Sequence, residues 1–458
     1  ANATVQIRGQ TSKPECTKKL IKLKLKKNKG TWRGQRTINL NKHMTEGMRF
    51  RNKLAYDLIR GIPQMVGLRT QFVHLYVKDN TEESGVKFED YGIYTQVEQL
   101  NKTALKSHGL DSNGQLYKIN SFEFYRYEDI IKKEDDAGYD KTAFEKMLEI
   151  KGDSDHTKLI DMLTDLNDYS IGIEDVLKEH FDEENIVYWM AFQILMGNVD
   201  TQNRNVYLYS PLNSDIWYFI AWDNDGCLMR PEYELRNFSD QNSWEKGISN
   251  YWGNILFQRC LKSRSFREKL NDAILDLREY LNKDMLTSKI ESYKNVLKPY
   301  LYLMPDAEYE PLTSEQYDQI AASLPDEIEK NYQLYLESLE TPMPFYIGVP
   351  SIDGDKLKFN WDVSYDLDAE DITYSVEVAR DYLFQDVIYQ NTTLTVPESE
   401  MELPNAGQYF VRVRATNTSG KTQDAFDYYV TDEGKHYGMK CFYITEDSTV
   451  EEDNYEEG

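Results

Sequence analysis

The stretch Gly197-Asn198-Val199-Asp200-Thr201-Gln202-Asn203-Arg204-Asn205 follows a strongly apolar run at residues 186–196, which is typical of a buried helix. A second acidic stretch, Trp222-Asp223-Asn224-Asp225-Gly226, follows an aromatic run at residues 217–222, which predicts a buried strand. We therefore expect two acidic loops that leave rigid elements, and a reaction centre needs supports of this kind.

The two loops carry the residue types that phosphoryl transfer from ATP requires. Asp200 suits the orientation of an attacking hydroxyl, while Asn205 and Asp223 suit a Mg²⁺ ion, which prefers hard oxygen ligands. The order of these three residues, with a hairpin before the last, is also that of protein-kinase catalytic sites. Asp and Asn are common turn formers, so the pattern gains weight only from the rest of the chain.

The N-terminal part predicts a small lobe of strands with one helix. Residues 4–9 and 20–26 alternate as a strand pair, and the second strand carries Lys22, Lys24 and Lys26 on one face. These lysines either form a solvated face or place one ammonium group in a phosphate site. The remaining elements of this lobe are a helix that Thr45 caps at residues 45–59 and strands at 70–77 and 91–98.

The middle of the chain predicts a larger, helix-rich lobe. Helical patterns cover residues 144–150, 157–169, 173–180, 183–196, 253–281, 284–297 and 313–338. Pro325 should break or kink the last of these helices, since proline cannot donate the helical hydrogen bond.

The pattern changes after residue 340. Short alternating runs at 357–361, 373–379 and 407–415 predict a β-sandwich over residues 341–446, followed by an acidic tail at 447–458. This part resembles a fibronectin type III module, with Trp361 and Tyr409 as core aromatics. Ordinary core packing explains both residues equally well.

Composition limits the function classes. A chain of 458 residues is expected to form more than one domain, and a formal net charge of −25 disfavours nucleic-acid partners. No apolar run is long enough to span a bilayer, so we expect no transmembrane segment. The four cysteines are scattered singly, without the spacing of a zinc site. The chain starts at Ala1, as expected for a product of a longer precursor with a removed signal segment.

The sequence resembles the CotH kinases, the spore coat protein H family of atypical protein kinases. The resemblance covers most of residues 3–340 and rests on the two acidic loops and on four N-terminal motifs: Val5 to Gly9, Lys18-Lys19 through Lys22 to Leu25, Arg51 to Leu58, and Tyr91 to Tyr94 through Glu98.

This resemblance implies an α+β, protein-kinase-like fold of two lobes at about residues 1–118 and 119–340, followed by the all-β sandwich. It implies a bacterial, extracytoplasmic enzyme, secreted or at the cell surface, that transfers the ATP γ-phosphate to Ser or Thr hydroxyls of a protein with Mg²⁺ or Mn²⁺. Asp200 would be the catalytic aspartate, and Asn205, Asp223 and Asp225 would be metal ligands. The residues expected at ATP are Lys24, Lys22, Arg8, Gly9 and Glu98.

The chain departs from ordinary protein kinases at the phosphate site. It has no GxGxxG loop, so only Gly9 and the polar residues after it could cover the phosphates. The helix at 45–60 offers Asp57 as the nearest acidic partner for Lys24, but Asp57 suits an ordinary helix surface equally well. The choice among Lys19, Lys22 and Lys24 therefore stays open.

Two other function classes compete with a kinase. The first is a catalytically silent binding or adhesion protein at the cell surface, whose sandwich presents a surface to a partner. The second is a metal-dependent hydrolase, which is less well supported because the six histidines do not cluster near the acidic loops.

Overall fold

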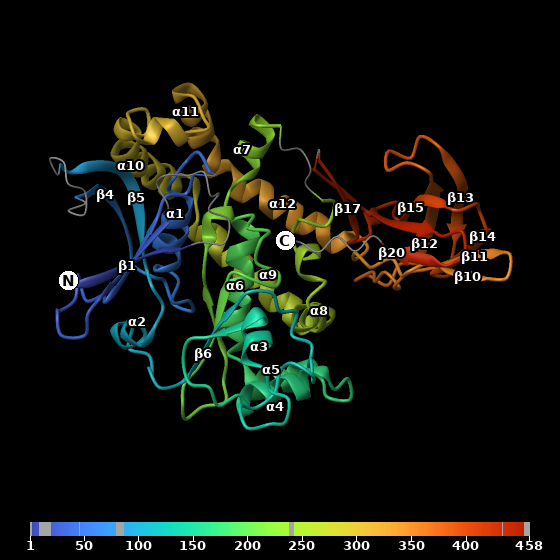
Figure 1. Cartoon of the computed structure of the whole chain (residues 1–458), viewed down its shortest axis with the longest axis horizontal. Helices are drawn as coiled ribbons and strands as arrows, with labels where there is room; N and C mark the ends of the chain where they lie inside the picture. Colours follow the sequence, from blue (N-terminus) through green and yellow to red (C-terminus); the bar gives the residue numbers. More distant parts are fainter. Residues whose placement is uncertain are drawn as a thin grey trace. The chain divides into compact units, whose positions relative to one another are not determined.

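The computed structural model describes residues 2–8, 20–44, 46–78, 87–237, 242–432 and 434–452. Helices and sheets are both abundant, so the prediction of a mixed α+β protein is confirmed (Figure 1). Internal contacts divide the chain into two compact units. The first contains Ala1–Leu235 and Asn254–Asn331, and the second contains Arg236–Gly253 and Tyr332–Gly458.

The first unit begins with a five-stranded antiparallel sheet in the order β1-β2-β3-β5-β4. Its strands are β1 (Ala3–Arg8), β2 (Leu20–Leu25), β3 (Thr37–Asn41), β4 (Thr70–Val77) and β5 (Glu89–Glu98). Four of the five match the predicted strands. The sequence interpretation missed β3, which follows a turn-rich segment after β2.

The two faces of this sheet differ in character. Leu23 of β2 lies opposite Ile38 of β3, and both join the small apolar cluster on one face. Because side chains alternate along a strand, Lys22 and its partner Asn39 lie on the other face. The alternation predicted for β2 thus separates an apolar face from a lysine-bearing face.

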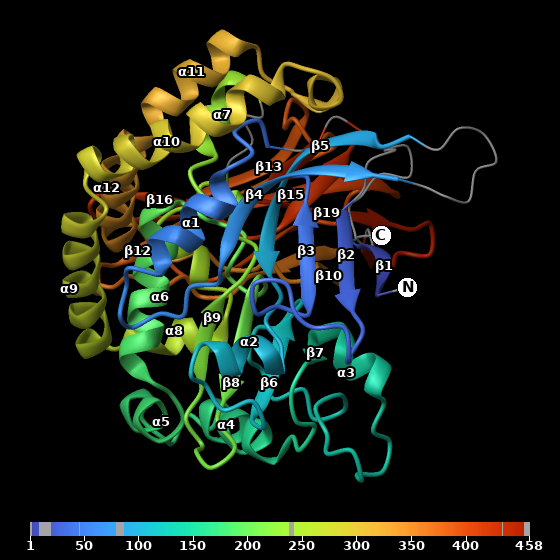
Figure 2. The same ribbon diagram turned by 90° about the vertical axis from the view of Figure 1, so that its left-hand side faces the viewer.

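Helix α1 (Arg51–Ile59) follows the sheet's third strand and packs against β4 (Figure 2). Most of its residues are buried, and no side chain caps its N-terminus, which follows Phe50. The predicted cap, Thr45, lies outside the described residues. A short helix, α2 (Lys102–Ser107), follows β5, and the Asn101 side chain caps it.

The remainder of the first unit combines a four-stranded antiparallel sheet, in the order β7-β6-β8-β9, with helices. Its strands are β6 (Gln115–Ile119), β7 (Leu148–Ile150), β8 (Val206–Ser210) and β9 (Tyr218–Ala221). The helices between β6 and β8 in the chain are α3 (Lys141–Met147), α4 (Thr157–Asn167), α5 (Ile173–His180) and α6 (Glu183–Leu195).

The later helices are α7 (Arg230–Leu235), α8 (Ile255–Lys262), α9 (Arg264–Tyr280), α10 (Lys283–Leu301), α11 (Ser314–Ser323) and α12 (Glu327–Glu340). Helix α9 packs alongside α6. Ser263 separates α8 from α9 and caps the latter, so the predicted helix at 253–281 is two helices. Pro325 lies in a short 3₁₀ turn between α11 and α12, where the break was predicted. Residues 148–150 form β7 rather than the end of a helix, because they pair with β6.

The second unit contains a three-stranded sheet and a six-stranded sheet that contribute to one buried core. The smaller sheet consists of β10 (Ser351–Asp353), β11 (Lys356–Asn360) and β14 (Glu398–Glu402). The larger consists of β12 (Ile372–Ala379), β13 (Val387–Leu394), β15 (Gly407–Asn417), β16 (Thr422–Asp424), β19 (Met439–Ile444) and β20 (Val450–Glu452). A separate hairpin pairs β17 (Tyr428–Thr431) with β18 (Gly434–Tyr437).

The core of the second unit is aromatic. Phe442 of β19 stacks on Tyr409 of β15 and meets Phe359 of β11 edge-on, so residues of both sheets share the cluster. Trp361 and Tyr409, the aromatics singled out in the sequence, are both buried in it.

No helix among the described residues is long and apolar enough to cross a membrane.

Candidate active site

The first acidic loop leaves the end of helix α6. This helix is buried on nearly all sides, and Asp182 caps its first turn by accepting a hydrogen bond from the backbone N–H of Asn185. The chain leaves the helix through Gly197, whose φ of 58° favours glycine. A Cβ atom on Gly197 would also lie only 2.7 Å from the Asn331 side chain. Both constraints fix the direction in which the loop starts.

The structure brings Asp200 and Asn205 together. The Asn205 Nδ2 group donates hydrogen bonds to the Asp200 carboxylate at 2.8 Å and to the Asp200 carbonyl at 3.0 Å. The Asp200 side chain is still 57% exposed, so one face of the carboxylate is open to a second molecule. Arg204 lies on its other side, with Nε 3.7 Å from a carboxylate oxygen.

The environment of Asp200 raises its pKa above the usual aspartate range. The main cause is displacement of water by the surrounding loops, and the nearby Asp225 carboxylate acts in the same direction. The charge of Arg204 and the hydrogen bond from Asn205 oppose the rise. A carboxylate with a raised pKa accepts a proton more readily, as a general base must.

The second acidic loop follows β9 and is tied directly to the first. The backbone N–H of Trp222 donates to the carbonyl of Asn205 at 3.1 Å. Asp223 is the next residue, so this hydrogen bond fixes the start of the second loop against the end of the first. Asp223 adopts a φ of 53°, and its N–H donates to the Tyr56 hydroxyl of helix α1 at 3.1 Å. Helix α1 therefore helps to hold a left-handed backbone conformation at Asp223.

A chain of buried amides links helix α1, the second loop and the first loop. Asn52 accepts a hydrogen bond from the N–H of Asn224 at 3.2 Å. The Asn224 side chain accepts from Gln193 of α6 at 3.1 Å, and Gln193 in turn accepts from Asn198 at 3.0 Å. All of these side chains are nearly inaccessible to solvent, so the network fixes one arrangement of the two loops.

His43 supports the far end of the second loop. Its Nδ1 atom lies 3.4 Å from the Asp225 carboxylate, and its other ring nitrogen lies 3.4 Å from the Asn52 amide. Burial lowers the pKa of His43, but the hydrogen bond to Asp225 and the neighbouring carboxylate charges outweigh burial and raise it. A protonated His43 would therefore pair with Asp225.

The oxygen donors near the loops suit a hard divalent cation. Asn205 uses its amide nitrogen to bind Asp200, and its amide oxygen accepts no hydrogen bond from the described part of the chain. Asp223 and Asp225 add two carboxylates. No group of three or more His, Cys, Asp or Glu side chains that could hold a metal is found among the described residues. This donor set fits Mg²⁺, which protein groups usually hold through one or two carboxylates with phosphate oxygens as further ligands.

The lysine-bearing face of the first sheet is also linked to these loops. Asn39, the cross-strand partner of Lys22, donates to the Gln99 side chain at 3.1 Å. Gln99 donates in turn to the Tyr207 hydroxyl at 3.2 Å, and the Tyr207 ring packs edge-on against Trp222. Lys24 lies two residues after Lys22 on the same face and is exposed.

Several predicted site residues have other positions. Glu98 aligns with Ile38, on the apolar face of the sheet and away from Lys22 and Lys24. Its buried carboxylate binds Arg69 and, at 2.8 Å, His108. Asp57 pairs with Lys53 at 2.8 Å and with the Tyr293 hydroxyl rather than with Lys24.

The rest of the predicted phosphate site lies at the limit of the described chain. Arg8 is the last residue of β1, and only its backbone is described. Gly9, Lys18 and Lys19 lie outside the described residues.

A buried ion cluster joins helix α1 to the segment after the second loop. Arg51 contacts Glu46 at 2.8 Å and Glu232 of α7 at 2.6 Å, and its side chain is inaccessible to solvent. Glu232 also accepts a hydrogen bond from the backbone N–H of Gly47 at 2.8 Å, and Arg51 donates to the carbonyl of Leu228. Breaking such a cluster on one side would leave a buried charge unpaired.

Comparison with known proteins decides the family. A family model described as CotH kinase protein matches residues 5–335, which include the five-stranded sheet, helix α1 and both acidic loops. The chain belongs to the CotH kinase protein family. It is therefore a kinase-like protein, and the resemblance seen in its sequence motifs is confirmed for most of the chain.

Two similar proteins accompany the CotH family match. The inner spore coat protein H of Bacillus subtilis (strain 168) is 22% identical over 293 residues, which are 63% of this chain and 74% of that protein. Among solved structures, the crystal structure of a Helicobacter pylori proinflammatory kinase, CtkA, is 13% identical with a TM-score of 0.32. That comparison covers 70% of this chain and 94% of the other.

The sequence analysis assigned no role to the residues that hold the two acidic loops together, although two of them, Asn52 and Tyr56, lie in the Arg51–Leu58 motif. Asn52 and Tyr56 are four residues apart, so the helical period places them on one face of α1. Thr37, Asn39 and Asn41 alternate with Ile38 and Leu40, a signal that predicts a strand with one polar face. His43 and Gln99 carry no such signal, because their partners come from distant segments.

Proposed function

We propose that this CotH-family chain is an ATP-dependent protein kinase that transfers the γ-phosphate to Ser or Thr hydroxyls of a protein. The observation that carries the proposal is the hydrogen-bonded pair of Asp200 and Asn205, tied through Trp222 to Asp223. Phosphoryl transfer needs positioned carboxylates and amides rather than covalent chemistry from the protein. A scaffold without activity has no chemical need for this combination.

In this proposal Asp200 is the catalytic residue. Its half-exposed carboxylate would accept a hydrogen bond from the acceptor hydroxyl and then its proton, which the raised pKa favours. Asn205 would hold the carboxylate in place through its Nδ2 group. Arg204 would balance part of the negative charge of the loop.

Asn205, Asp223 and Asp225 would hold Mg²⁺ or Mn²⁺ through their oxygens. When bound together with ATP, the metal would neutralise phosphate charge. Tyr56 and Asn52 would orient the loop that carries the two aspartates, and His43 would orient Asp225.

The lysine-bearing face of the first sheet supports a phosphate contact by Lys22 or Lys24. We propose that Arg8 and Gly9, at the end of β1, complete the cover over the phosphates. For Glu98 we propose a supporting role at the end of β5, because its carboxylate is engaged by Arg69 and His108.

We further propose that the first unit is a two-lobed kinase fold and that the second is a fibronectin type III-like sandwich. The shared core of two antiparallel sheets supports the second proposal. Because the relative from Bacillus subtilis is named as an inner spore coat protein, we propose a surface or coat-associated, extracytoplasmic location for this chain.

A catalytically silent binding protein is the second candidate. One observation favours it: Glu98, one of the residues expected at ATP, is engaged by Arg69 and His108 on the face of the sheet opposite Lys22 and Lys24. In that case the second unit would present the binding surface, and the first would neither bind nor turn over ATP.

The test combines phosphate transfer with nucleotide binding. Purified protein is incubated with labelled ATP, Mg²⁺ and dephosphorylated casein as acceptor, and labelling of both proteins is measured. We expect Asp200→Asn to lower transfer by at least about a thousandfold while calorimetry still detects Mg-ATP. Asp223→Asn should weaken Mg-ATP binding itself.

Asp161→Asn is the matched control, because Asp161 is exposed on α4 and should not affect either measurement. Transfer that is unchanged in Asp200→Asn would exclude the catalytic role. If the unmodified protein binds no ATP with either Mg²⁺ or Mn²⁺, the silent binding protein is the better conclusion.

A further inference from the structure

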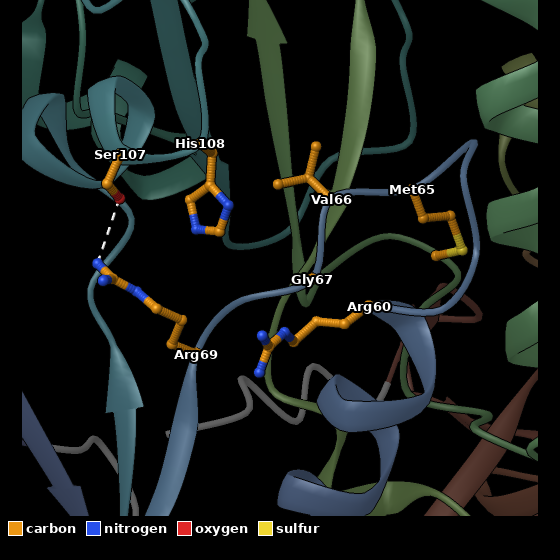
Figure 3. A pocket seen from close by; sticks show the side chains of 7 residues that line it. All are labelled: Arg60, Met65, Val66, Gly67, Arg69, Ser107 and His108. Atoms are coloured by element: carbon orange, nitrogen blue, oxygen red, sulfur yellow. Dashed lines mark hydrogen bonds between the residues drawn. The ribbon is translucent and has the colours of Figure 1, made fainter.

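A polar cavity lies in the first unit, on the Glu98 side of the sheet (Figure 3). Its volume is about 400 Å³, and its polar lining consists of Arg60, Arg69, Ser107 and His108. Met65 and Val66 form an apolar wall on one side. The lining comes from the loop between α1 and β4 and from the end of α2.

Arg60 is the uncommitted cation of this cavity. Its guanidinium makes no hydrogen bond or ion pair with the part of the chain that the structure describes, and Figure 3 shows its side chain extending past Gly67 in the direction of Arg69. Gly67 allows this position, because a Cβ atom there would lie 2.4 Å from the Arg60 Cγ and 2.7 Å from its backbone nitrogen. The glycine thus brings the Arg60 stem against the cavity wall.

Arg69 and His108 also line the cavity, and Glu98 binds both side chains. Glu98 accepts hydrogen bonds from the Nε and Nη2 groups of Arg69 and contacts the Nε2 of His108. Arg69 also donates to Ser107 at 3.2 Å and to the carbonyl of Arg33. One Nη1 hydrogen of Arg69 and the Nδ1 atom of His108 keep no partner among the described residues. These groups are preoriented by the buried carboxylate.

The charges of the cavity favour an anion. Two guanidinium groups line the cavity, and Glu98, the carboxylate behind it, contacts only one of them, that of Arg69. The contacts with His108 and Arg69 lower the pKa of Glu98 to about 2, so it is ionised at neutral pH. The excess positive charge belongs to Arg60, in a chain of net charge −25. Guanidinium forks from separate segments suit an ion that offers oxygens in several directions.

We propose that the cavity formed by Arg60, Arg69, Ser107 and His108 binds a phosphate group. A phosphate monoester carries close to two negative charges at neutral pH and has three terminal oxygens. These oxygens can accept hydrogen bonds from the donors that line the cavity. If the phosphate belongs to a phosphorylated side chain, Met65 and Val66 would contact the carbon part of that side chain. The ligand is either a phosphorylated side chain of a protein or a small phosphate ion.

This site is separate from the proposed ATP site. The cavity lies on the side of β5 to which Glu98 points, whereas Lys22 and Lys24 lie on the opposite face of the sheet. Binding at the cavity therefore needs neither ATP nor Asp200, and it can be measured without any phosphate transfer.

Calorimetry of the full chain in the absence of nucleotide tests the proposal. The probes are inorganic phosphate, a phosphoserine peptide and the same peptide without phosphate. Arg60→Gln should weaken binding of the phosphate-bearing probes by at least about tenfold, because charge-assisted hydrogen bonds are lost. Arg60→Lys should fall between the two, since lysine keeps the charge but not the planar fork.

Arg264→Gln is the matched control, because it removes one exposed positive charge from the same unit and should leave affinity unchanged. Tighter binding of the phosphopeptide would identify a phosphorylated side chain as the ligand, and equal affinity would identify the phosphate ion. The proposal is overturned if no phosphate-bearing probe binds, if Arg60→Gln binds as well as the unmodified protein, or if the peptide without phosphate binds equally.

Discussion

Glu98 shows how one residue can serve two sides of a strand end. Its carboxylate lies on the apolar face of the sheet and orders Arg69 and His108, while the next residue, Gln99, reaches the opposite side through Asn39 and Tyr207. Two adjacent residues, Glu98 and Gln99, thus connect to different sites: Glu98 to the cavity lined by Arg69 and His108, and Gln99 to the proposed ATP site.

The pH dependence of stability should report on Glu98. Its pKa is about 2 in the folded chain against 4.5 for an ordinary glutamate, so the carboxylate stabilises the fold above pH 4.5 by about 3 kcal/mol. That contribution is lost as the pH falls from 4.5 toward 2. Urea unfolding should therefore show a larger loss of stability for Glu98→Gln at pH 7 than at pH 3.

The exposed Glu279 provides the comparison for this experiment. Glu279→Gln should track the unmodified protein at both pH values. A gap between Glu98→Gln and the unmodified protein that stays constant from pH 7 to pH 3 would contradict the assigned role of the Glu98 charge.

At the scale of elements, helix α1 organises the site although it contributes none of the predicted catalytic residues. Tyr56 and Asn52 hold two successive backbone N–H groups of the second acidic loop, and Arg51 holds the segment that follows it. The helix has no side-chain cap, so its stability comes from packing and from these contacts.

Tyr56→Phe tests whether α1 positions the second acidic loop. The hydroxyl is the partner of the Asp223 N–H, and its loss should weaken Mg-ATP affinity by roughly threefold to tenfold, the effect of one hydrogen bond. Calorimetry with Mg-ATP gives the affinity. Tyr280→Phe is the control, because it also removes a hydroxyl that contacts α1, but its hydrogen bond goes to the carbonyl of Leu58 and not to the loop. Equal effects of the two variants would contradict a specific role for Tyr56.

Local patterns predicted most elements but not the connections between them. The apolar run at residues 186–196 and the break at Pro325 are properties of short windows, and the predicted helix and break are both confirmed. Strand β3 was missed although its five residues alternate between polar and apolar side chains. Asp200 and Asn205 are close in the chain, so their pairing is the kind of contact that a sequence can predict. Gln99 and His43 acquire their roles only from segments that are distant in the chain.

At the scale of the whole molecule, each compact unit has its own core. The aromatic cluster around Phe442 is built entirely from residues between Phe345 and Val450, all of the second unit. The sequence predicted a sandwich there because each strand is a local alternation. It could not predict that residues 236–253, which precede helix α8, belong to the same unit.

Phe442→Ala should therefore affect the two units differently. Removing this buried ring should destabilise the second unit by about 3–5 kcal/mol, since its contacts with Tyr409 and Phe359 are lost. Urea unfolding followed by circular dichroism should show an earlier transition, while Mg-ATP affinity below that transition stays unchanged. A parallel loss of nucleotide affinity would show that the cores are energetically coupled.

The buried cluster of Arg51, Glu46 and Glu232 has a consequence for control. In many signalling enzymes the segment after the metal loop is ordered only when a modification supplies its missing charge partner. Here that partner is built in and shielded from solvent, and separating it would cost several kcal/mol. The segment is therefore set when the chain folds. In the kinase proposed above, this cluster would give constant activity, and the total activity would be adjusted by how many copies exist and which substrates reach them.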